Sequence, residues 1–257
     1  MYNQPEPLDD EHGSYDDQGD SAEPEALLDD EAFDEGDLDE SGEPSLRYRG
    51  ASNDPAFGYL IALALIVGLT PLIPAHADLR YALGWGLLTL FGSLAWLLGG
   101  AARIGQERLE NVAWGVVFGL IIAAPLLMVG GGALTTTVHL MFQTEIGGTV
   151  QRLPVGAVLA FLFFAMPTGE TLFFRGLLQQ RQPFWLTGFL ASLWSILLFF
   201  PMIDVAGFPV VAIIIGTALV LMNQLYSYVR QRNGLAAAWI CQIVVNVVLL
   251  FIPYLGT

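Results

Sequence analysis

The stretch GETLFFRGLLQQ, Gly169–Gln180, sets a glutamate and an arginine, Glu170 and Arg175, inside an otherwise apolar part of the chain. An ionised side chain on a membrane helix costs about 2.5–3.5 kcal/mol by insertion scales, so such residues are usually paired, face a cavity and serve a function. We therefore expect the chemistry of the protein to be centred on this stretch.

Apolar runs of about 20 residues, the length needed to cross a bilayer, follow one another from Phe57 onward. The chain of 257 residues is 54% hydrophobic, which argues against a soluble domain with a single core. The expected fold class is an all-α, polytopic integral membrane helical bundle with about seven transmembrane helices. The predicted spans lie near 57–74, 81–100, 111–131, 153–168 with a continuation into the central stretch, 184–203, 207–228 and 235–253.

Two details of this bundle are open. A re-entrant turn at 165–169 is an alternative that would raise the number of spans to eight. The loop 132–152 is long enough to contain an interfacial helix, which we expect around Thr135–Phe142.

Residues 1–50 differ in composition from residues 51–257, which form the predicted membrane domain. They hold 18 of the 25 acidic residues and two of the ten basic residues, for a net charge of −16. With few large apolar side chains, this segment cannot bury enough surface to offset the entropy of ordering it. We expect a disordered, acidic cytoplasmic tail; the alternative is that Ala26–Leu28 and Phe33 dock a basic partner.

The arginines predict the orientation, because positive charge is retained on the cytoplasmic side of a membrane. No cleavable signal peptide is expected, since no basic and apolar segment begins the chain. We predict a multi-pass protein of the plasma membrane with its N-terminus in the cytoplasm. Eight arginines then fall at or toward the cytoplasmic face and two, Arg80 and Arg152, outside; the eight are Arg47, Arg49, Arg103, Arg108, Arg175, Arg181, Arg230 and Arg232.

Helix geometry predicts where the two charged residues of the central stretch point. Pro167 and Gly169 interrupt the apolar run, so Glu170 is expected in the first turn of a new helix, where the helix dipole favours a carboxylate. At 3.6 residues per turn Thr171 and Arg175 share a face, whereas Glu170 and Arg175 diverge by about 140°. Arg175 is therefore expected to find its counter-ion on the Thr171 side or on another helix.

Other residues of the membrane domain are interpreted as structural. Gly115, Gly119 and Ala123 lie four apart, a spacing that lets helices approach closely. The single cysteine, Cys241, lies in an apolar run, is expected in the core, and excludes an internal disulfide and a multi-cysteine metal site.

The central stretch resembles the first motif of the CAAX-protease and bacteriocin-processing family of intramembrane endopeptidases. That motif has two adjacent glutamates, three residues, an arginine and usually a glycine, embedded in Phe and Leu. Glu170, Arg175 and Gly176 match it, and Thr171 stands in place of the second glutamate.

Two further motifs of this family are a Phe with a His four residues later, and a His with an Asn or Asp four residues later. For the first, the chain has Phe199 with Ile203, or Phe200 with Asp204. For the second it has Gln242 with Asn246, on one face of a helix. The order and spacing of the three regions fit over about 110–253, and both histidine positions are substituted.

The resemblance implies a cavity among membrane helices in which a glutamate and histidines activate water against a peptide bond, in some accounts with a metal. Gln242 cannot act as a base, and Gln, Thr and Asn cannot reproduce a site of imidazole and carboxylate ligands. We expect no metal and no cofactor. His76 and His139 are expected in loops on the outer side, away from such a cavity.

Whether the protein is an enzyme is left open by these residues. In an active endopeptidase Glu170 would activate water, Arg175 would support it electrostatically, and Gln242 and Asn246 would donate hydrogen bonds to the oxyanion or the substrate. In a pseudoprotease the same residues would hold the cavity together, and the protein would bind a peptide without cleaving it. A small transporter is the third alternative, because broken helices with buried charges also build ion sites.

The position of Asp204 suggests a further role. Because Thr171 replaces an acid, Asp204 is a candidate partner of Arg175; the alternative is an exposed loop residue. The expected partners of the protein are membrane lipids and a membrane-embedded or lipidated peptide, together with a basic partner of the acidic tail, and no nucleic acid is expected.

Overall fold

The computed structural model describes residues 55–73, 75–98, 108–203 and 205–256. These residues belong to one compact unit, Arg49–Thr257. The predicted acidic tail and the candidate residue Asp204 lie outside the described residues.

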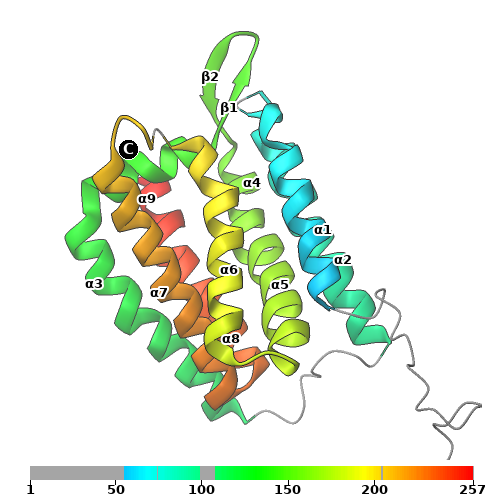
Figure 1. The fold of residues 1–257 in the computed structure, drawn as a ribbon. Coiled ribbons are helices and arrows are strands. Elements are labelled where there is room, and N and C mark those ends of the chain that lie inside the picture. Colours follow the sequence, from blue (N-terminus) through cyan, green and yellow to red (C-terminus); the bar gives the residue numbers. More distant parts are fainter. Residues whose placement is uncertain (1–54, 74, 99–107, 204, 257) are drawn as a thin grey trace, which may run out of the picture. The chain divides into compact units, whose positions relative to one another are not determined.

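The described chain is a bundle of helices with one short β-hairpin at its end (Figure 1). Six of its helical segments are long and apolar enough to cross a membrane, and a seventh, α2, has 21 residues. The elements are α1 (Pro55–Gly68), α2 (Ala77–Leu97), α3 (Leu109–Met141), β1 (Gln143–Ile146), β2 (Thr149–Arg152), α4 (Val155–Ala160), α5 (Met166–Glu170), α6 (Phe184–Phe199), α7 (Pro209–Asn233), α8 (Leu235–Asn246) and α9 (Ile252–Leu255).

The outer surface of the bundle is apolar, as expected of a protein that faces lipid. Large hydrophobic side chains are more than half exposed on several helices, among them Leu60, Ile121, Val129 and Ile213. The predicted all-α membrane fold is therefore confirmed.

The predicted loop 132–152 is wrong in its first half. Helix α3 continues through it to Met141, so the segment predicted as an interfacial helix is the end of a long helix. The second half forms the β1–β2 hairpin, whose turn consists of Gly147 and Gly148. Both glycines have positive φ angles, 61° and 81°, which a two-residue hairpin turn requires.

The central stretch lies in one continuous helix, Val155–Gln180, which we call the Glu170 helix. No break or re-entrant turn occurs at Pro167. The backbone widens instead into π-helical segments at Phe161–Ala165 and Thr171–Leu177, on either side of α5. Such adjustments satisfy the backbone groups that a proline leaves free inside a membrane helix. The prediction that Glu170 begins a new helix is therefore wrong.

Glycines allow close contact between α3 and α8. A Cβ atom on Gly115 would collide with the carbonyl oxygen of Ala237 in α8, and one on Gly119 would lie 2.9 Å from Val244 Cβ. Ala123 is fully buried in the same contact region. The predicted packing role of these small residues in α3 is confirmed.

Glycines also allow close packing of α2 against the Glu170 helix. A Cβ atom on Gly169 would lie 2.8 Å from the Trp85 carbonyl oxygen, and one on Gly92 would lie 2.6 Å from Leu172 Cβ. Only glycine at these positions allows the two backbones to approach so closely.

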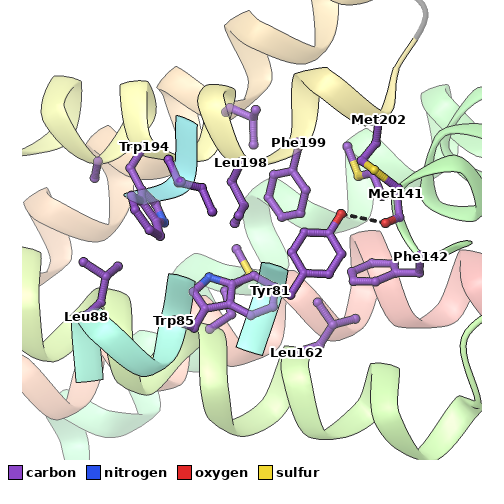
Figure 2. Close-up of a cluster of buried hydrophobic side chains, with 14 of the residues drawn as sticks. Tyr81, Trp85, Leu88, Met141, Phe142, Leu162, Trp194, Leu198, Phe199 and Met202 are labelled. Carbon is purple, nitrogen blue, oxygen red and sulfur yellow. Dashed lines mark hydrogen bonds between the residues drawn. The ribbon is translucent and has the colours of Figure 1, made fainter. Parts of the chain in front are cut away.

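An aromatic core joins α2, the end of α3, α6 and the Glu170 helix (Figure 2). The Tyr81 ring stacks on Trp85 at 5.2 Å between centroids and also contacts Phe142 and Phe199. Its hydroxyl donates to the Met141 carbonyl oxygen at 2.6 Å. The Glu170 helix contributes Leu162, Phe173 and Phe174 to this core, and Trp85 connects the core to Glu170.

Arg80 is buried at the end of the bundle that carries the hairpin. Its guanidinium donates to the carbonyl oxygens of Leu198 at 2.5 Å, Leu197 at 2.8 Å and Ile66 at 3.4 Å. These carbonyls belong to the last turns of α6 and α1, where the helix dipole favours a cation. Arg80 therefore ties three helices together.

Replacing Arg80 by Met is expected to lower the free energy of unfolding by about 2 kcal/mol, because buried carbonyl groups lose their donor. Chemical unfolding in detergent micelles measures this loss. The exposed Arg232, replaced by Met in the same way, is the control and should change stability little. Equal effects of the two substitutions would contradict the capping role of Arg80.

Candidate functional site

Glu170 is the centre of a buried polar cluster contributed by three helices. Its side chain is 1% exposed. Oε1 accepts a hydrogen bond from Trp85 Nε1 in α2 at 3.1 Å, and Oε2 accepts one from Gln242 Nε2 in α8 at 2.6 Å. The nearby Trp194 is fully buried, and its indole N–H has no hydrogen-bond partner among the described residues.

Gln242 and Thr171, two of the candidate site residues, join Glu170 in this cluster. The Thr171 hydroxyl donates to Gln242 Oε1 at 3.1 Å. The amide of Gln242 thus uses its oxygen toward Thr171 and its nitrogen toward Glu170. Its role in the fold is to connect α8 to the Glu170 helix twice.

Asn246, the fourth candidate, lies one turn further along α8. Its Nδ2 donates to the carbonyl oxygen of Leu162 at 3.1 Å. Leu162 belongs to the first π-helical segment, where a carbonyl displaced from its usual pairing accepts this bond. Gln242 and Asn246 therefore both contact the Glu170 helix, at two different heights.

Arg175 finds its closest partner on another helix, one of the two alternatives expected from the sequence, although that partner is the neutral Asn223 and not a counter-ion. The helix is π-helical over Thr171–Leu177, where backbone bonds join residues five apart, so Glu170 and Arg175 lie on the same side of it. Arg175 Nη1 contacts the Glu170 carbonyl oxygen at 3.5 Å, and Nη2 donates to Asn223 Oδ1 in α7 at 2.7 Å. The expected divergence of Glu170 and Arg175 by about 140° is wrong, because it assumed 3.6 residues per turn.

Arg175 is fully buried and surrounded by neutral groups. Its guanidinium lies 5.3 Å from the Tyr226 ring and 5.7 Å from the Phe174 ring, distances at which cation–π attraction acts. No ion pair joins it to Glu170 within the described chain, although the two charges interact electrostatically. The predicted pairing with Asp204 is untested because that residue is not among those described.

Asn223 and Ser195 complete the site and were missed from the sequence. Asn223 Nδ2 donates to Ser195 Oγ in α6 at 3.2 Å and to the Leu219 carbonyl oxygen at 3.0 Å. A polar amide in the middle of the apolar span 207–228 was the available signal for Asn223. Nothing in the sequence distinguishes Ser195 from other small residues of its span.

A cavity of about 40 Å³ lies beside the cluster. Its polar lining comes from Glu170, Ser195, Asn223, Tyr226 and Asn246, and the rest of its wall is apolar. This volume exceeds the roughly 10–15 Å³ that one water molecule needs. A water molecule therefore has room next to the Glu170 carboxylate, whereas a peptide does not.

The histidines lie elsewhere. His76 is exposed just before α2. His139 is in the last turn of α3, not in a loop as predicted, and its Nε2 lies 3.3 Å from the Tyr254 carbonyl oxygen. Within the described ranges, no group of three or more His, Cys, Asp or Glu is placed to hold a metal. The donor set around Glu170, with one carboxylate, an amide and a hydroxyl, does not fit a zinc site.

The chemical capacity of the cluster is consequently limited. Glu170 is its one carboxylic acid, and the guanidinium of Arg175 has hydrogen-bond donors but no acceptor. The side-chain amides of Asn223, Gln242 and Asn246 already donate within the bundle.

Comparison with protein-family models, with curated proteins and with solved structures gives no significant match to this chain.

Proposed function

We propose that the protein is an intramembrane endopeptidase-like protein, similar in its central motif to the CAAX-protease and bacteriocin-processing family, that binds a membrane-embedded peptide and cleaves it slowly or not at all. The main support is the hydrogen bonding of Glu170. Both of its oxygens accept bonds from side chains of other helices, Trp85 and Gln242. In this arrangement the carboxylate holds α2 and α8 against the Glu170 helix.

The surrounding residues support the same proposal. Catalysis of peptide hydrolysis needs donors that are free to meet the developing oxyanion. The candidates for this role are Gln242 and Asn246. The side-chain amide of Gln242 donates to Glu170, and that of Asn246 donates to the Leu162 carbonyl oxygen. A general base also works best with a group that returns the proton to the leaving amine, usually a histidine. None of the described side chains that contact Glu170 is a histidine.

Peptide binding without cleavage is the first candidate function, and slow cleavage of the bound peptide is the second. The cavity beside Glu170 favours the second. A carboxylate accepts up to about four hydrogen bonds, so the two observed bonds leave capacity for a water molecule. A water in the cavity would lie against the one group of the cluster that is able to take its proton.

Cleavage of membrane peptides by the protein in lipid vesicles distinguishes these two candidates. We expect wild type to release no more product than Glu170→Gln, while both bind the peptide. Glu170→Gln keeps the shape of the side chain, so retained binding shows that the variant is folded. The opposite result is that wild type cleaves the peptide, and that Glu170→Gln abolishes cleavage without loss of binding. This result would show that the protein is an active peptidase.

The proposed location is the plasma membrane, with the N-terminus in the cytoplasm. Helix directions alternate along the chain, so the start of α3 and the link between α7 and α8 lie at one end of the bundle. Arg108, Arg181, Arg230 and Arg232 lie at this end, and Arg80 and Arg152 lie at the other. The distribution supports a cytoplasmic position for the first end. The acidic segment 1–50 would lie on the same side, where it is suited to a basic partner.

A further inference from the structure

Arg232 lies in the last turn of α7, at the end of the bundle opposite the hairpin (Figure 1). Its Nε donates to the Tyr228 hydroxyl at 3.3 Å, and its guanidinium carbon lies 6.0 Å from the centre of the Tyr228 ring. Both residues are exposed. The terminal nitrogens Nη1 and Nη2 have no acceptor within the described part of the chain, so Tyr228 orients the guanidinium and leaves two donor groups free.

Aromatic rings from two neighbouring helices surround Tyr228. Phe118 in α3 and Phe184 in α6 meet the Tyr228 ring edge-on, at 6.4 and 6.5 Å between centroids. Trp114, one turn before Phe118, contacts the Phe118 ring at 5.8 Å and is 51% exposed. Tyrosine and tryptophan concentrate at the level of the lipid headgroups. This group of rings therefore indicates that the last turn of α7 lies near that level.

The length of α7 leads to the same level. Its 25 residues, Pro209–Asn233, extend for about 37 Å, whereas the hydrocarbon core of a bilayer is about 30 Å thick. A tilt of about 20° shortens the helix along the membrane normal only to about 35 Å. One end must therefore reach beyond the hydrocarbon. That end is the one with Arg230 and Arg232, because the first turn of α7 has no charged side chain.

The face of α7 that continues from Arg232 into the membrane is apolar. Ile214, Leu221 and Tyr228 follow one another seven residues apart, a spacing that keeps side chains on one face of a helix, and Arg232 lies one turn further. Ile214 is 63% exposed and Leu221 is 60% exposed. This face thus presents a cation, then an aromatic ring, then an apolar stripe. A phospholipid has the matching order of headgroup phosphate, ester groups and hydrocarbon chain.

The charge at this end of the bundle favours an anionic lipid over a neutral one. Among the described residues here, the basic side chains are Arg108, Arg181, Arg230 and Arg232, and the acidic one is Glu110, for a net charge of +3. A guanidinium also fits a phosphate, because two of its N–H groups donate to two phosphate oxygens at once. Basic groups beside a membrane helix attract lipids with negative headgroups. Charge complementarity therefore selects a phospholipid with a net negative charge.

We propose that Arg232, oriented by Tyr228, binds the headgroup phosphate of an anionic phospholipid whose acyl chain lies along Leu221 and Ile214. The inference is independent of the proposed peptide binding, which depends on the Glu170 cluster. Nη1 and Nη2 of Arg232 donate to the phosphate oxygens, and the apolar stripe contacts the chain. A zwitterionic lipid binds more weakly, because the arginines at this end repel its quaternary ammonium group.

Native mass spectrometry of the full-length protein, released from detergent micelles, counts the lipids that stay bound. The micelles contain equal amounts of anionic phosphatidylglycerol and zwitterionic phosphatidylcholine with the same acyl chains. We expect wild type to retain phosphatidylglycerol about fivefold more than phosphatidylcholine, the effect of about one arginine at an anionic surface. Glycerol phosphate, which has the headgroup chemistry without acyl chains, should not displace the bound lipid.

Arg232→Gln is the decisive variant, and Arg108→Gln is its matched control, since each removes one positive charge at the same end of the bundle. Arg108 is exposed and contacts no aromatic ring among the residues that the structure describes. Arg232→Gln should abolish the preference for phosphatidylglycerol without changing the Tm in micelles, and Arg108→Gln should keep the preference. Tyr228→Leu retains the charge but not its orientation, so it should reduce the preference about twofold.

Three results would overturn the inference. Equal retention of the two lipids by wild type would show that the site does not select anionic headgroups. Equal losses in Arg232→Gln and Arg108→Gln would show that the general positive charge of this end attracts the lipid, with no defined site at Arg232. Displacement of phosphatidylglycerol by glycerol phosphate would show that the site takes a soluble phosphate and that the apolar stripe contributes nothing.

Discussion

Replacing Arg175 by Met is expected to lower the free energy of unfolding by about 3 kcal/mol, because the buried side-chain oxygen of Asn223 loses its charged hydrogen-bond donor. Arg175 is fully buried, bonds to Asn223 Oδ1 at 2.7 Å and interacts electrostatically with Glu170. Without it, Asn223 Oδ1 and the Glu170 carbonyl oxygen lose the guanidinium that contacts them. Chemical unfolding of the purified protein in mixed micelles provides the measurement.

A double substitution separates the charge effect from the loss of packing. Glu170→Gln removes the charge that Arg175 balances, so the double variant should be more stable than the sum of the two single losses predicts. Asn223→Leu should behave similarly to Arg175→Met, because it leaves the guanidinium without its closest acceptor. Simple additivity of the Glu170→Gln and Arg175→Met effects would show that the two charges are independent.

Replacing Gly115 by Val is expected to lower the free energy of unfolding by about 3 kcal/mol, at the upper end of the range for overpacking. A Cβ atom at this position collides with the carbonyl oxygen of Ala237, which is backbone and cannot rotate away. Helices α3 and α8 would have to separate, and α8 carries Gln242 and Asn246. Thermal unfolding in detergent, together with peptide binding, measures both consequences.

Gly131, in the same helix, is the matched control. A Cβ atom there meets nothing within 4 Å, so Gly131→Val should be nearly neutral. If the two glycine variants were equally stable, close packing at Gly115 would not be what holds α3 against α8.

The membrane fold could be predicted from the sequence because hydrophobic length is a local property. The predicted spans 184–203 and 235–253 lie within two residues of the helical segments Phe184–Met202 and Leu235–Leu255. The close contact at Gly115 was predictable for a similar reason, since a row of small residues has few other uses in a membrane helix. The hairpin was not predicted, because its strands are short and follow directly on a long apolar helix.

The candidate site was predictable in part. Glu170 and Gln242 lie together, as the shared cavity implied by the family resemblance led us to expect, and Thr171 bonds to Gln242. The partner of Arg175 was not, because the sequence does not show that the helix widens into a π-helix at Thr171–Leu177. Asn223 belongs to a helix 48 residues away along the chain, so only packing brings it to Arg175.

The sequence by itself determined that the chain folds as a bundle of membrane helices, and that Glu170 and Arg175 lie inside it, because both follow from the cost of placing polar groups in lipid. Only the tertiary structure decided which neutral groups satisfy the two charges. The π-helical turns rotate Glu170 toward Trp85 and Gln242 and Arg175 toward Asn223. These partners lie on helices far apart in the sequence from Glu170 and Arg175, and no local pattern of residues specifies such contacts.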